Sequence, residues 1–189
     1  MRYCFNDREL NSLTYKQAVL YDKRTFFQYY ISLLKIKILI LYAFCQSTDH
    51  NLMTNKISFL IISFCLAFTI NGFFFSDESM KIIEINNRIN NLKYQIPQII
   101  YSSLVYSSFS ILFKTLSVSD KSILDIKKWE KYSEKKWKQI YRLIKIKFVI
   151  FYFLGFLLML FFWYFISCFC AVFVNTQVIL IENTFLSFG

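Results

Sequence analysis

Residues that could perform chemistry are few and scattered in this sequence. Asp49 and His50, the single histidine, stand together in a short polar stretch. Two ligands are too few for a transition-metal site, which needs three or four, so we expect no metal. The five cysteines form no C-x-x-C motif; they are Cys4, Cys45, Cys65, Cys168 and Cys170. The last three lie in apolar runs, where thiols are buried and unreactive.

Catalytic motifs are also missing from the sequence. It contains no G-x-S-x-G, no phosphate-binding glycine loop and no paired carboxylates within an apolar run. The longest apolar runs carry no acidic, basic or histidine residue, although proton pumps and ion-coupled transporters usually carry one. We therefore expect no enzyme activity and no cofactor.

The composition indicates that part of the chain lies in lipid. Of its 189 residues 56% are apolar and 21% aromatic, and the net charge is +10. Soluble domains contain roughly 45–50% apolar residues, and here the excess is gathered in uninterrupted runs. A membrane-crossing helix needs about 20 mostly apolar residues. The sequence predicts an all-α integral membrane protein with spans at 57–75, 96–113 and 148–174.

A fourth apolar segment, 26–46, is ambiguous because Lys35 and Lys37 fall in its middle. A lysine at mid-bilayer is costly, so we favour an interfacial or partly inserted helix. Charge supports this choice, since residues 1–37 hold seven basic residues and three acids, and residues 114–147 hold eleven and four. Three spans place both basic stretches in the cytosol, as the positive-inside rule favours. A four-span form is the alternative.

Residues 114–147 are predicted to form a long basic amphipathic helix leading into the last span. Its cationic face would attract anionic lipid on the cytosolic side. A docking site for a partner protein is the main alternative, and nucleic-acid binding is disfavoured for a membrane-tethered chain. The candidate lipid- or partner-binding residues are Lys127, Lys128, Lys131, Lys135, Lys136, Lys138, Arg142 and Lys145.

Three shorter segments complete the predicted organisation. Residues 1–25 form a soluble amphipathic segment without a cleavable signal. Residues 76–93 form a short amphipathic helix with an apolar stripe and an Asn-rich face. The tail, 175–189, is apolar again, and we interpret it as a truncated span or a docking segment.

Serines are concentrated in the predicted span 96–113. Small residues let helices approach closely in lipid, and their hydroxyls can bond across helices. We therefore predict helix packing through Ser102, Ser103, Ser107 and Ser110. The alternative is that residues 99–110 line a polar path.

Several strings resemble a known kind of sequence when taken together: LNSLTYKQAVLYDKRTFFQYY, YQIPQIIYSS and FWYFISCFCAVFVNTQ. They are similar to a multi-pass segment near the C-terminus of large transmembrane proteins of ciliates and related protists. The resemblance extends from about Leu10 to the end of the chain. It implies a multi-pass membrane protein and brings no functional residue with it.

These observations favour a membrane anchor or accessory subunit of a larger complex. Its expected partners are membrane lipids and other membrane-protein subunits. The alternative is a subunit of a homo-oligomeric channel or transporter, and a membrane-embedded enzyme is a distant third. The sequence does not indicate which membrane holds the chain.

Overall fold

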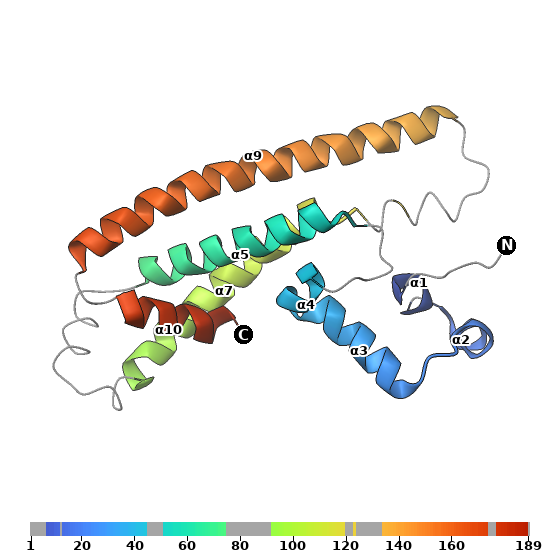
Figure 1. The fold of residues 1–189 in the computed structure, drawn as a ribbon, viewed down its shortest axis with the longest axis horizontal. Helices are drawn as coiled ribbons and strands as arrows, with labels where there is room; N and C mark the ends of the chain where they lie inside the picture. Colours follow the sequence, from blue (N-terminus) through green and yellow to red (C-terminus); the bar gives the residue numbers. More distant parts are fainter. Residues whose placement is uncertain are drawn as a thin grey trace. The chain divides into compact units, whose positions relative to one another are not determined.

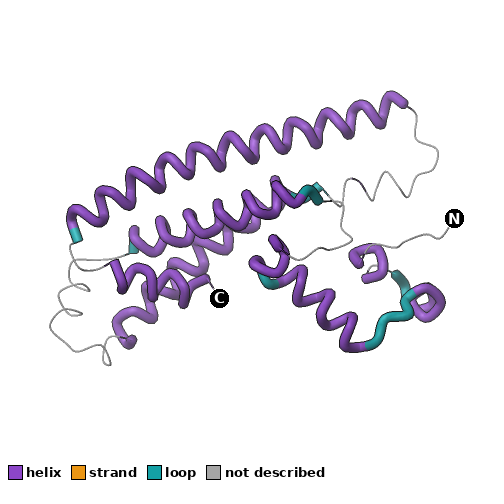
Figure 2. The backbone as a smooth tube through the Cα atoms, in the orientation of Figure 1, coloured by secondary structure: helices purple, strands orange, loops and turns teal. Residues whose placement is uncertain are grey.

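The computed structural model describes residues 7–11, 13–44, 51–74, 92–119, 123, 134–173 and 177–188. Within these ranges every regular element is an α-helix (Figures 1 and 2). The helices are α1 (Asp7–Asn11), α2 (Tyr15–Tyr21), α3 (Phe26–Lys37), α4 (Leu39–Phe44), α5 (Met53–Phe73), α7 (Leu92–Ser117), α9 (Glu134–Val172) and α10 (Gln177–Phe188). The predicted all-α fold is therefore confirmed.

Three helices in the described part of the chain are long and apolar enough to cross a membrane. They comprise Met53–Phe73, Ile96–Ser117 and Trp137–Val172. These segments overlap the three predicted spans, and their length and composition are compatible with an all-α integral membrane protein.

Residues 134–147 of the basic segment belong to the same helix as the last span. Helix α9 has 39 residues and is therefore about 58 Å long at ~1.5 Å per residue, well above the ~30 Å of a hydrocarbon core. The first residues of the predicted 114–147 helix belong instead to the end of α7, which extends to Ser117. The predicted helix 76–93 lies outside the described residues except for its last two, which begin α7.

The segment 26–46 is divided into two helices. Helix α3 has 12 residues and α4 has six, and Ile38 between them is extended, with φ −80° and ψ 115°. Neither piece is long enough to cross a bilayer. Helix α3 begins with a capping box, in which the Thr25 hydroxyl accepts from the Gln28 backbone N–H and the Gln28 side chain accepts from that of Thr25.

The chain divides into two compact units. The first contains Met1–Leu60 and Leu116–Val149, and the second contains Ile61–Thr115 and Ile150–Gly189. Helices α5, α7 and α9 pass from one unit into the other. Each unit is described by itself below.

Packing in the second unit depends on two glycines. A Cβ added at Gly155 of α9 would lie 2.5 Å from the Ile62 Cδ1 atom of α5. A Cβ at Gly72 of α5 would lie 2.5 and 2.7 Å from two ring atoms of Phe165 on α9. Only glycine leaves room for these approaches.

Aromatic side chains fill the space beside Gly72. The Phe73 ring stacks on Phe165 at 4.8 Å between centroids, and Phe165 continues to Phe169 at 6.1 Å. Helix α10 joins this cluster through Leu180, which is buried with Phe169. The described part of the C-terminal tail is therefore a 12-residue helix packed on the second unit.

The two glycines predict opposite responses to alanine. At Gly72 the rigid Phe165 ring must move, and we expect Gly72→Ala to destabilise the protein by about 1–3 kcal/mol. At Gly155 the Ile62 methyl can rotate away, and the gain of about 1 kcal/mol in helix propensity offsets the crowding. Thermal unfolding in detergent should show a lower Tm for Gly72→Ala and an unchanged or higher Tm for Gly155→Ala. Equal losses at both positions would contradict this packing.

Candidate functional site

The four serines predicted to pack helices differ in burial. Ser102 is completely buried, Ser103 and Ser110 are half-buried, and Ser107 is exposed. The Ser103 and Ser107 hydroxyls donate to the carbonyl oxygens of Ile100 at 2.9 Å and of Ser103 at 2.8 Å. The hydroxyl hydrogens are already donated within α7. The two serines therefore present a small surface that does not have to donate hydrogen bonds to water. Packing against another helix through Ser103 and Ser107 stays a prediction.

The described part of the predicted cationic face forms a stripe on α9. Lys138, Arg142 and Lys145 are all exposed, and their spacing of four and three residues places them on one side of the helix. Lys135 and Lys136 lie in the first turn of α9, and their side chains are not described. Lys127, Lys128 and Lys131 lie outside the described residues.

The three long helices differ greatly in how much of their apolar surface the chain itself covers. In the most apolar stretch of each, 67% of residues are buried for α5, against 17% for α7 and 11% for α9. Large side chains on α9 are accordingly exposed, among them Trp163 at 64% and Tyr164 at 70%. Most of the surface of α7 and α9 is thus available to lipid or to other chains.

The first unit contains a group of polar contacts at the end of α7 that the sequence did not predict. Asn55 of α5 donates its side-chain N–H to the Ser117 carbonyl oxygen at 3.4 Å, and the Ser119 backbone N–H donates to the Asn51 side chain at 3.0 Å. The Lys147 ammonium group of α9 donates to the Val118 carbonyl oxygen. We call these three contacts the α7 clasp. They bind backbone groups that a helix end leaves without partners, and a cation there also complements the helix dipole.

The sequence marks one donor of the α7 clasp but not the group that accepts its hydrogen bond. Lys147 directly precedes the uncharged run 148–174, which marks it as a boundary residue. Its acceptor is 29 residues away in the chain, and no local pattern pairs the two.

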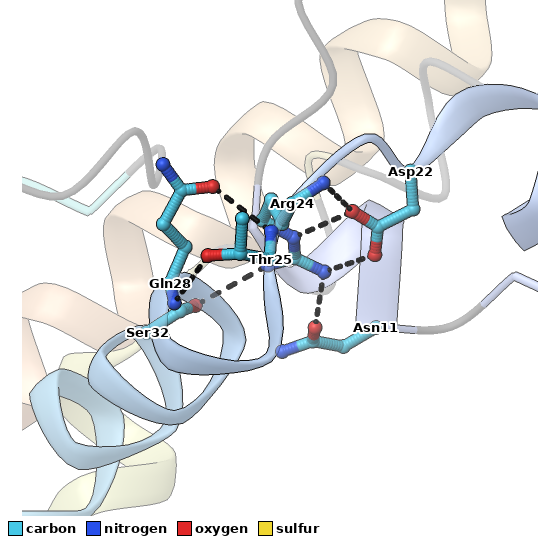
Figure 3. Close-up of polar contacts among 6 residues, drawn as sticks. All are labelled: Asn11, Asp22, Arg24, Thr25, Gln28 and Ser32. Atoms are coloured by element: carbon cyan, nitrogen blue, oxygen red, sulfur yellow. Dashed lines mark hydrogen bonds and ion pairs between the residues drawn. The ribbon is translucent and has the colours of Figure 1, made fainter.

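A second polar group surrounds Arg24, between α2 and α3 (Figure 3). The Arg24 Nε and Nη2 atoms donate to the two carboxylate oxygens of Asp22 at 2.8 and 2.6 Å. Nη2 also donates to the Asn11 side chain at 2.9 Å, and Nη1 donates to the Ser32 hydroxyl at 3.5 Å. The guanidinium group lies 5.3 Å from the centre of the Tyr29 ring. One side chain thus connects α1, the α2–α3 turn and α3.

The Arg24 side chain also changes the acidity of its partner. Its hydrogen bond lowers the pKa of Asp22 below the ordinary value of 3.8; burial opposes this shift, and the backbone N–H and charge of Arg24 add to it. Asp22 therefore stays ionised and paired over the whole physiological range.

The predicted burial of the cysteines is right for Cys65 and wrong for Cys168 and Cys170. Cys65 is buried, as expected, with its thiol 3.5 Å from the Met159 sulfur atom. Cys168 and Cys170 were expected to be buried but are exposed on α9, because the apolar run around them faces outward. Among the described residues no three His, Cys, Asp or Glu side chains are grouped as metal ligands would be. Asp49, His50, Cys4 and Cys45 lie outside the described residues.

Comparison with known proteins adds no relative. No protein-family model matches the chain, and no curated protein or solved structure is significantly similar to it.

The α7 clasp predicts a contrast between two neighbouring lysines. Lys147→Met keeps the length of the side chain but leaves the Val118 carbonyl without its charged donor, a loss of about 1.5–3 kcal/mol. Lys145→Met removes the same charge from an exposed position two residues away, so it is the matched control. Chemical unfolding in detergent should therefore show a lower stability for Lys147→Met alone. Similar stabilities for the two variants would mean that the clasp contributes nothing.

The Arg24 network predicts how Asp22 titrates. Because its folded pKa is lowered, the stability that the pair contributes is complete above the unfolded pKa and is lost as pH falls through the folded pKa. Arg24→Gln should raise the pKa of Asp22 toward 3.8. Lys23→Gln, an exposed neighbour, should leave it nearly unchanged. NMR titration of the Asp22 carboxyl carbon in micelles measures both, and equal midpoints in wild type and Arg24→Gln would refute the assignment.

Proposed function

We propose that this chain is a multi-pass membrane anchor or accessory subunit of a larger membrane complex and that it carries out no catalysis. The observation behind the proposal is the uneven burial of the three long helices. The chain surrounds α5 itself and leaves most of α7 and α9 uncovered. Such a subunit uses one helix for its own stability and offers two to its surroundings.

The chemistry of the uncovered surface supports assembly rather than transport. The described stretches of the uncharged runs contain no Asp, Glu, Lys, Arg or His side chain. The hydroxyls of Ser103, Ser107 and Ser108 on α7 are bonded to carbonyl oxygens of the same helix. Small residues whose polar atoms are satisfied within the helix allow close helix–helix contact in lipid. We therefore assign Ser103 and Ser107 to contact with a helix of another subunit.

The cationic stripe of α9 fits the same role. Lys138, Arg142 and Lys145 precede the apolar part of the same helix without a break. We expect this stripe on the cytosolic side, next to anionic headgroups, where each basic residue adds about 1 kcal/mol of attraction. This placement follows the positive-inside rule.

A homo-oligomeric channel is the second candidate, because Ser107 and Ser108 are exposed on one span. In that arrangement α7 helices from several copies would surround the path. A hydroxyl can still accept a hydrogen bond from water after it has donated its own. The two candidates differ in what copurifies with the chain and in whether ions cross.

Substitution of the α7 serines separates the two functions. Ser103→Leu with Ser107→Leu blocks close approach, and the hydrogen bonds that it removes are those to carbonyl oxygens of the same helix. We expect the native particle in mild detergent to lose its other subunits while the melting temperature stays the same. The matched control, Leu104→Ile on the same helix, should keep the particle intact.

An unchanged particle of mixed composition would contradict the assignment of Ser103 and Ser107, because it would place the contact elsewhere. Two other results would contradict the anchor proposal itself. One is a wild-type particle containing only copies of this chain. The other is ion flux in liposomes that the double variant abolishes, which would support the channel.

A further inference from the structure

The N-terminal helices of the first unit expose far more apolar surface than they bury. In α2 no residue is buried, and Tyr15, Val19 and Leu20 are 84%, 66% and 69% exposed. In α3 only Ser32 is buried, while Phe26 and Phe27 are 84% and 68% exposed. Isolated helices of seven and 12 residues are marginal in water, so these faces need a cover.

A contact between α4 and α5 places this region at the edge of the bilayer. Lys56 is the last charged residue before the uncharged run 57–75, and it is 5% exposed. Its ammonium group lies 5.0 Å from the centre of the Tyr42 ring on α4. Because a span begins directly after Lys56, Tyr42 lies at the level where α5 enters the membrane. Helix α3 leads into α4 through the single extended residue Ile38.

One side of α3 carries a row of apolar residues with lysines beside it. Phe27, Tyr30 or Ile31, and Leu34 recur there at helical spacing, Ile38 follows directly after the helix, and all are exposed or half-buried. Lys35 and Lys37 occupy the last turn. Aromatic rings prefer the headgroup level, and lysine stems lie along apolar surface while their ammonium groups reach phosphate.

The charges of this region favour an anionic surface over a neutral one. Between Tyr15 and Phe44 there are five basic residues and a single acid, Asp22. That acid is already paired with Arg24 at 2.6 Å. Of the remaining basic side chains, Lys16, Lys35 and Lys37 lie on α2 and α3, and each adds attraction to anionic lipid near the surface.

The Arg24 network gives the region a defined shape before it meets the membrane. Its bonds to Asn11, Asp22 and Ser32 hold the turn between α2 and α3 in one geometry. A turn that is already ordered loses less conformational entropy when α2 and α3 bind to a membrane.

We propose that α2, α3 and α4 form an in-plane anchor that lies on the anionic leaflet beside the start of α5. The aromatic face of α3 enters the boundary between headgroups and acyl chains, and Lys35 and Lys37 bind lipid phosphates. Arg24 is a positioning residue that sets the angle between α2 and α3. The anchor does not depend on the accessory-subunit proposal, because lipid covers these faces whether or not other subunits are present.

The test measures the surroundings of α3 in the full chain. In a cysteine-free background, Phe27→Cys and Lys23→Cys each receive a spin label, and the protein is placed in nanodiscs with or without anionic lipid. With anionic lipid, we expect the label at position 27 to be accessible to oxygen and protected several-fold from a water-soluble paramagnetic reagent. The label at position 23 should remain accessible to the soluble reagent and is the matched control.

Two further variants test the roles of charge and shape. Lys35→Gln with Lys37→Gln should remove the difference between anionic and neutral nanodiscs at position 27. Arg24→Gln should broaden the distribution of distances between labels at positions 19 and 27, without changing the melting temperature of the spans.

The proposal fails under either of two outcomes. If position 27 is as open to the soluble reagent as position 23, the face is in water. If position 27 is immobile and closed to both oxygen and the soluble reagent, a protein covers it, either a second copy or another subunit. The particle-composition experiment on the α7 serines is separate, so failure of one proposal leaves the other standing.

Discussion

The fold depends on the lack of water in the hydrocarbon core. Every backbone N–H and C=O in that layer must be satisfied within the protein, which selects helices and makes their ends the critical points. The end of α7 shows how this chain meets the constraint. Asn55 and Lys147 donate to the carbonyl oxygens of Ser117 and Val118, and each donor lies just outside an uncharged run. The polar border of one span is thus completed by side chains from the borders of two others.

The same constraint shapes the interior of the spans. Thr69 and Ser102 donate their hydroxyl hydrogens to carbonyl oxygens of their own helices, those of Cys65 and Ile99. Once bonded in this way, such residues behave toward a neighbouring helix mainly as small side chains. Gly72 completes the set by letting the Phe165 ring approach to a distance that a larger residue prevents. Close packing therefore replaces the hydrophobic effect, which gives no net attraction between apolar helices in lipid.

Run length and charge predicted the three spans. The thickness of the hydrocarbon core sets the length of an apolar run, and its low polarity excludes charge. The break at Ile38 was not predicted, since an isoleucine carries no local signal for an extended residue; only Lys35 and Lys37 indicated that the segment does not cross. The exposure of Cys168 and Cys170 was missed for a different reason. An apolar neighbourhood in the sequence does not distinguish protein interior from lipid, and burial in a membrane protein depends on which helices meet.

The two units differ in chemistry, and this difference connects the candidate surfaces. The first unit holds the α7 clasp, the Arg24 network and the cationic stripe of α9, all rich in charge or hydrogen bonds. The described part of the second unit has only Lys93, Lys114 and Glu182 as charged residues and is held by glycine contacts and stacked rings. A bilayer imposes the same division, with headgroups at its border and hydrocarbon inside. In the proposed function, the first unit meets lipid headgroups, and the apolar helix surfaces meet lipid tails and other subunits. This separation of charge from apolar surface in the described residues is the chemical basis of the anchor role proposed above.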